Sequence, residues 1–190
     1  MKRLFTYTSF IWLCALGIAF GVALQKQSLQ WKIDSILHEE AIFLDQMTRN
    51  EIAETVFQLS QDYDIDPVLI LAMMKVESHF RTSARSHRGA MGLMQVKSIV
   101  VEDIADELGI DPSREKELQH NISFNIHVGV HYLTELLTRF HGDLSKALMA
   151  YNRGPTSVAK NYGKRGVPYG GYQKKVLETY MQLNSQTQID

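Results

Sequence analysis

Residues 67–80 most constrain what this chain can fold into. The run PVLILAMMKVESHF is apolar on nearly every side when it is drawn as a helix, and such a helix is normally buried. Asp66 is a suitable N-cap and Pro67 suits a first helical turn, so the helix should begin there. A central helix needs surrounding elements, and the chain shows no period-two alternation that would indicate strands.

Helical spacing of apolar residues continues outside this segment. Ile52, Val56, Leu59 and Tyr63 recur three or four residues apart, after a capping-box pattern at residues 48–51 (Thr-Arg-Asn-Glu). A glycine-rich loop is expected at residues 86–92. Further helices are expected at residues 97–108, 122–140, 143–151 and 171–183. The fold class that these patterns predict is mainly α.

The N-terminus carries a targeting signal. Lys2 and Arg3 precede residues 4–24, which contain no charged residue, and about 20 apolar residues suffice to span a bilayer. We expect a signal anchor in residues 1–24, with the rest of the chain on the extracytoplasmic, periplasmic side of the inner membrane. The small-x-small sequence at residues 21–23 offers a cleavage site, so a cleaved signal peptide is the alternative.

The remaining chain divides into three parts. Residues 25–47 have apolar side chains at helical spacing, which predicts an amphipathic juxtamembrane helix. This helix would be a stalk or would pack on the domain. The domain itself is expected at residues 48–183, and residues 184–190 are expected to be a tail.

Composition excludes several classes of function. The chain has 190 residues and a formal net charge of -1, so no overall field favours nucleic acid or anionic lipid. Cys14 is its one cysteine, so an intrachain disulfide and a thiolate metal cluster are excluded.

Glu77 is the residue of the central helix that fits a buried position least, because Glu is rarely buried unless it is paired or used. Met74, Met73 and Ile70 lie three, four and seven residues earlier, on the same helical face. Lys75 points to nearly the opposite side. Apolar surroundings without a cation would raise the carboxyl pKa, as a general acid at neutral pH requires. A helix-terminal Glu that points into water is the alternative.

Three motifs follow in order. They are Glu77-Ser78 with Ser86, Gly89-Ala90 and Gly92-Leu93-Met94-Gln95; then Asn125-Ile126, Gly129 and Tyr132-Leu133; then Ala150-Tyr151-Asn152 with Gly154-Pro155. Over roughly residues 50–182 the chain resembles the catalytic domain of the lytic transglycosylases of the soluble-lytic-transglycosylase (SLT) type, which have a goose-lysozyme-like fold. The resemblance implies a lysozyme-like helical domain with a substrate groove.

The same resemblance implies a reaction. Glu77 would protonate the β-1,4 oxygen between N-acetylmuramic acid and N-acetylglucosamine in peptidoglycan. It would then accept the C6 hydroxyl proton as that hydroxyl attacks C1 and forms 1,6-anhydromuramic acid. The nucleophile belongs to the substrate, so the second carboxylate of most glycosidases is unnecessary. No cofactor is implied.

Five substrate-binding residues are implied as well: Ser86, Met94, Gln95, Tyr151 and Asn152. Ser86 would contact the sugar's N-acetyl region or orient the catalytic carboxyl. Met94 and Gln95 would line subsites. Tyr151 would place its hydroxyl near the carboxyl, and Asn152 would brace the end of its helix.

The chain departs from the family near its C-terminus. Many members have Glu-Thr-x-x-Tyr-Val ahead of the last helix, whereas residues 167–180 read VPYGGYQKKVLETY, with glycines in the Glu-Thr place. Tyr172, Lys175 and Val176 still match. The missing acid leaves the details of the subsites and the branch of the family open.

Two other patterns suggest weaker alternatives. His127 and His131 are four residues apart on a predicted helix and could hold a metal, but the zinc-protease pattern is absent, and we predict no metal site. Basic residues alternate with tyrosines in residues 153–175, as in single-strand binding surfaces. A glycan-facing edge or a solvated surface suits an exported domain better, so we predict no nucleic-acid partner.

Three functions remain. The first is a peptidoglycan lytic transglycosylase held at the inner membrane, whose small size would suit work beside a secretion or conjugation apparatus. The second is a lysozyme-type muramidase that hydrolyses the same bond with water. The third is a non-catalytic glycan-binding scaffold of the cell envelope.

Overall fold

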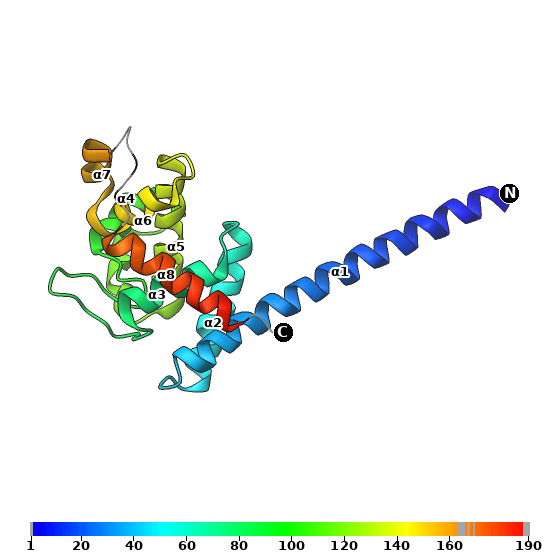
Figure 1. Ribbon diagram of the computed structural model, residues 1–190, viewed down its shortest axis with the longest axis horizontal. Helices are drawn as coiled ribbons and strands as arrows, with labels where there is room; N and C mark the ends of the chain where they lie inside the picture. Colours follow the sequence, from blue (N-terminus) through cyan, green and yellow to red (C-terminus); the bar gives the residue numbers. More distant parts are fainter. Residues whose placement is uncertain (1, 163–165, 167, 169, 188–190) are drawn as a thin grey trace.

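The chain folds into a body of shorter helices, from which one long helix projects (Figure 1). The structure is a computed structural model that describes residues 2–162, 166, 168 and 170–187, without the side chains of residues 2–16 and 18. The long helix is α1 (Lys2–Glu40), and the body comprises α2 to α8. The mainly α fold is therefore as predicted.

The apolar run forms the central helix, α3 (Pro67–Ser78), whose first eight residues are all buried. The Asp66 side chain accepts a hydrogen bond from the Val68 N–H at 2.8 Å, so the predicted N-cap is present. α3 packs along α8 (Gly171–Gln186) and also contacts α1 and α2 (Gln46–Asp62). The helix is thus held from several sides.

The C-terminal end of α1 belongs to the core of the body. Ile33, Ile36 and Leu37 are at most 1% exposed, and Lys32 donates a hydrogen bond to Asn184 of α8 at 2.6 Å. The N-terminal end of α1 projects away from the body. The C-terminal end of α8 lies near the point where α1 leaves the body (Figure 1). Residues 32–40, the foot of α1, therefore pack on the domain, and the helix continues outward from them.

The predicted boundary between the first two helices is wrong. α1 ends at Glu40, and α2 begins at Gln46 with Asp45 as its N-cap. The Asp45 carboxylate accepts hydrogen bonds from the N–H and the hydroxyl of Thr48, which is therefore inside the first turn. Asp45 captures both donors, because a carboxylate can accept several hydrogen bonds at once.

The remaining helices are α4 (Ser98–Leu108), η1 (Pro112–Gln119), α5 (Ile122–Arg139), α6 (Leu144–Arg153) and α7 (Pro155–Tyr162). The 3₁₀ helix η1 and α7 were not predicted, because eight residues are too few to show a clear apolar period. α8 continues to Gln186, so the expected tail begins inside a helix.

Strands are absent from the described part of the chain, where two isolated β-bridges join residues 85, 91 and 96 of the loop after α3. Most side chains of the expected anchor, residues 4–24, lie outside the description. A helix long and apolar enough to cross a membrane is not found among the described residues.

Candidate active site

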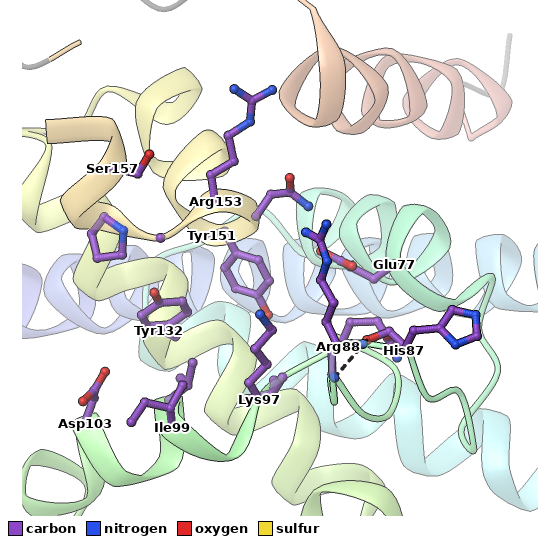
Figure 2. Close-up of a pocket in the computed structure, with 18 residues that line it drawn as sticks. Glu77, His87, Arg88, Lys97, Ile99, Asp103, Tyr132, Tyr151, Arg153 and Ser157 are labelled. Atoms are coloured by element: carbon purple, nitrogen blue, oxygen red, sulfur yellow. Dashed lines mark hydrogen bonds between the residues drawn. The ribbon is translucent and has the colours of Figure 1, made fainter. Parts of the chain in front are cut away.

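Glu77 lies in the last turn of α3 and faces a groove of about 920 Å³ (Figure 2). Met73, Met74 and Ile70, which share its face of the helix, are fully buried. Lys75 pairs instead with Glu40 of α1 at 2.8 Å, which leaves Glu77 without this cation. Burial raises the pKa of the Glu77 carboxyl to about 7, so much of it is protonated at neutral pH.

The hydroxyl of Tyr172, at the start of α8, partly offsets this effect. Tyr172 lowers the pKa of Glu77 against the larger influence of burial, so the two groups are neighbours. The hydroxyl is itself buried and has no hydrogen-bond partner of ordinary geometry among the described residues. Tyr172 was absent from the predicted site, although its match to the family pattern in residues 167–180 was the signal that could have placed it there.

Tyr151 of α6 lines the groove and contacts the loop that follows α3. Its hydroxyl donates a hydrogen bond to the Met94 carbonyl oxygen at 2.9 Å, and its ring lies 5.4 Å from the ring of Tyr132 between centroids. Burial and the nearby Glu77 charge raise the pKa of Tyr151 well above its usual value. The phenol therefore stays protonated and keeps its role as a donor.

The loop between α3 and α4 forms one wall of the groove. The Ser86 hydroxyl oxygen accepts hydrogen bonds from the N–H groups of Ala90 at 3.0 Å and Arg88 at 3.3 Å. The Gln95 amide donates to the carbonyl oxygens of Ala84 and Gly92 at 3.2 and 3.0 Å. Both side chains therefore hold the loop in shape and also line the groove.

A buried amide ties this loop to α5. Asn125 is 1% exposed, accepts from the Met94 N–H at 2.9 Å, and donates to the carbonyls of Met91 and Leu118, both at 2.9 Å. At Gly92, which has φ +73°, an added Cβ would lie 2.3 Å from the Asn125 amide nitrogen. Glycine is therefore required where the loop crosses Asn125.

Four of the five predicted substrate-binding residues line the groove: Ser86, Gln95, Tyr151 and Asn152. The fifth, Met94, does not contact it. Its side chain is fully buried and packs so closely on Gly129 that an added Cβ there would lie 2.6 Å from the Met94 Cβ. The prediction that the Met94 side chain lines a subsite is therefore wrong, and its backbone carbonyl is the part that serves Tyr151.

Asn152 is exposed at the groove and does not close its helix. The C-terminal end of α6 is closed by the Gly154 N–H, which donates to the Ala150 carbonyl oxygen at 2.7 Å. The Asn152 side chain lines the groove, and its amide has no hydrogen bond to another residue in the described part of the chain.

The two histidines predicted to be adjacent do not form a metal site together. The Tyr63 hydroxyl lies 2.9 Å from His127 Nε2 and 3.2 Å from His131 Nδ1 and so occupies a ring nitrogen of each. The His131 Nε2 lies instead 3.4 Å from a carboxylate oxygen of Glu107, and Glu135 completes a group whose ligand atoms lie within 4.8 Å of one another. Among the described residues, this cluster, and not the pair of histidines, is where three possible ligand groups come together.

Several known proteins are similar to this chain. A family model described as the transglycosylase SLT domain matches residues 54–168. The transglycosylase of Enterobacteria phage PRD1 is 31% identical over 118 residues, which cover 62% of this chain and 40% of the phage protein. The membrane-bound lytic murein transglycosylase C of Actinobacillus pleuropneumoniae serotype 5b is 34% identical over 113 residues, which cover 55% of this chain and 31% of that protein. The chain thus spans less than half the length of these relatives.

The fold is also similar to a solved structure. The X-ray structure of an inactive mutant of the lytic transglycosylase Slt from Pseudomonas aeruginosa superposes with a TM-score of 0.62 and 24% sequence identity. The match covers 70% of this chain and 24% of the other. At this identity the likeness supports the fold, while the chemistry has to be argued from the groove itself.

Proposed function

The chain belongs to the transglycosylase SLT domain family, and on that premise we propose that it is a peptidoglycan lytic transglycosylase with Glu77 as its single acid and base. The observation that carries the proposal is the Glu77 carboxyl, which is half-buried at the groove beside buried apolar residues and has a pKa raised to about 7. A carboxyl with that pKa can give up a proton and take one back near neutral pH.

In the first step the protonated Glu77 carboxyl donates its proton to the oxygen between N-acetylmuramic acid and N-acetylglucosamine. The C1–O bond breaks, and the N-acetylglucosamine side leaves as an alcohol. In the second step the Glu77 carboxylate takes the proton of the muramic C6 hydroxyl while that oxygen bonds to C1. The product is a 1,6-anhydro end, no water is consumed, and Glu77 is protonated again.

The acidic groups of the groove suit a mechanism with one carboxylate. Among the described residues that line the groove, Asp103 of α4 is the other acid, and Figure 2 shows it well separated from Glu77. Glycosidases with two carboxylates place them across the scissile bond, with about 5 to 10 Å between them. Asp103 is exposed on α4, so we assign it no part in the bond cleavage.

Groups around Glu77 would hold the sugar. The Ser86 hydroxyl oxygen accepts hydrogen bonds from two loop N–H groups, which leaves the hydroxyl proton available as a donor. Ser86 can therefore donate to an N-acetyl carbonyl or to the catalytic carboxylate. Asn152 would bind sugar hydroxyls through its exposed amide. Tyr151 would hold the loop carbonyl of Met94 and keep the groove wall in place beside Glu77.

The test is digestion of purified peptidoglycan by the full chain, followed by mass analysis of the soluble muropeptides. Anhydromuramic products that are lost in Glu77→Gln and kept in Glu102→Gln, an exposed acid outside the groove, would support the proposal. Products heavier by one water would indicate a muramidase. If the parent chain is folded and binds glycan but yields no product, and Glu102→Gln yields none either, the scaffold function would be indicated.

We also propose that residues 4–24 anchor the chain in the inner membrane, with the domain in the periplasm. The charge-free run after Lys2 and Arg3 supports this, as does the description of a relative as membrane-bound. The partner expected there is an envelope-spanning secretion or conjugation apparatus. Separation of inner membranes, protease accessibility and cross-linked co-purification test these points.

A further inference from the structure

Cationic side chains surround the catalytic groove. Arg88 and Lys97 come from the loop after α3, and Arg153 comes from the last turn of α6 (Figure 2). All three are exposed, and none of their side chains forms an ion pair or hydrogen bond with another residue that the structure describes. These cations are therefore available to a ligand.

The charge of the groove differs from that of the whole chain. The chain has a formal net charge of -1, whereas the groove combines three cations with one exposed acid, Asp103. Glu77 adds only part of a negative charge at neutral pH, because its carboxyl has a pKa of about 7, and the three cations still outnumber the acids. A local excess of positive charge in a concave site attracts anionic ligands and strengthens their binding.

We propose that Arg88, Lys97 and Arg153 form a carboxylate-binding subsite that selects glycan strands with acidic substituents. This inference rests on the proposed function and names the substrate class more narrowly. A neutral sugar chain needs hydroxyl and amide partners, which Ser86, Gln95 and Asn152 can supply. A guanidinium adds a bidentate partner for a carboxylate, and an ammonium adds a compact charge.

Carboxylates can reach this subsite from two sources. In a glycan without peptides, the lactyl group of each muramic residue ends in a free carboxylate. In a peptide-bearing glycan, that group is an amide and the carboxylates belong to the peptide. Both sources offer the same chemistry to the three cations, and ligands that differ only in these substituents distinguish them.

The experiment is titration calorimetry of the full chain in mild detergent, with Glu77→Gln present so that no ligand is cut. Three glycans of equal length serve as probes: a neutral chito-oligosaccharide, a peptide-free muramic glycan and a peptide-bearing one. The acidic glycans should bind about tenfold or more tightly than the neutral one at low salt, and the difference should shrink as salt is added.

A variant with Arg88→Gln, Lys97→Gln and Arg153→Gln should lose that advantage and keep its affinity for the neutral glycan. The matched control removes three exposed cations outside the groove, at Lys26, Lys116 and Arg139, and has the same net charge. It should bind all three glycans as the parent does. Tighter binding of the peptide-free glycan than of the neutral glycan would identify the lactyl carboxylate as the group that the cations bind. Tighter binding of the peptide-bearing glycan alone would identify the peptide carboxylates.

Equal affinity for neutral and acidic glycans would overturn the subsite and leave the proposed function intact. The same holds if the control variant loses as much affinity as the groove variant, since overall charge would then explain the effect. A protein that binds none of the three glycans would contradict the proposed function and this inference together.

Discussion

Burial of the Glu77 carboxyl affects folding as well as chemistry. Its pKa lies near 4.5 in an unfolded chain and at about 7 in the fold, so between these values the folded state binds the proton more tightly. Stability from this group is complete below the unfolded value and is lost as pH rises through the folded value. The charged form above neutral pH is therefore a cost that the fold carries.

Glu77→Gln should consequently stabilise the protein in a pH-dependent way. We expect a gain in the free energy of unfolding of roughly 1–3 kcal/mol at about pH 8, which disappears near pH 4, where the carboxyl is protonated in both states. Urea unfolding across this range measures it. Glu102→Gln should show no such trend, and a gain for Glu77→Gln that is independent of pH would contradict the burial argument.

The two groove tyrosines differ in what their hydroxyls do. Tyr151→Phe removes the donor to the Met94 carbonyl, so we expect a loss of roughly 1–3 kcal/mol in unfolding free energy and a slower formation of product. Tyr132→Phe is the matched control, because its hydroxyl has no hydrogen bond within the described residues. Thermal unfolding and initial rates of the pair test this. Equal losses in both variants would show that the Met94 contact is unimportant.

The sequence motifs predicted that Ser86, Gln95, Tyr151 and Asn152 lie near Glu77, and all of them line the groove, while their roles stay predictions. Glu77 could be singled out because a carboxylate in an apolar run is anomalous. The Met94 side chain was misplaced because a motif does not say whether a residue contributes its side chain or its carbonyl. Asn125 was part of a quoted motif, but its three buried hydrogen bonds emerge only when α5 and the loop are brought together.

At the scale of elements, local signals predicted helix starts better than helix ends. Asp66 and Pro67 specified the start of α3 through a cap and a fixed φ, which depend on neighbours in sequence. α1 ends at Glu40, which pairs with Lys75 of α3, whereas the apolar spacing in the sequence ran on to residue 47.

The foot of α1 should behave as core. Ile36→Ala is expected to cost roughly 2–5 kcal/mol, since Ile36 is 1% exposed and its loss leaves a cavity among buried residues. Trp31→Ala, on the same helix and 47% exposed, should cost much less although more atoms are removed. Denaturant unfolding of both variants decides the matter. A small effect at Ile36 would mean that α1 is only a stalk.

At the scale of the whole molecule, α1 joins the expected anchor to the domain as one helix. One residue inserted between Gln27 and Ser28 would turn the outer part by about 100° against the body, whereas seven would restore its direction to within about 20°. With residues 4–24 in the bilayer as proposed, the one-residue insertion should lower wall cleavage by the membrane-embedded protein more than the seven-residue insertion does.

Both insertions should leave the cleavage rate of detergent-solubilised protein unchanged, because the groove is far from the inserted site. Rates on isolated sacculi, with the protein in vesicles and in detergent, provide the comparison. Equal rates for the two insertions in vesicles would mean that the direction of the groove relative to the membrane does not matter.

The length of α1 has a further consequence. Contacts fix α1 to the body from Lys32 onward, so only Gln25 to Trp31, which rise about 10 Å at 1.5 Å per residue, separate the proposed anchor from the body. A groove held at a fixed distance from the membrane by a rigid helix can reach glycan only in a thin layer parallel to the membrane. With residues 4–24 in the bilayer as proposed, glycan strands nearer to the membrane, or farther into the wall, would lie out of reach of the groove.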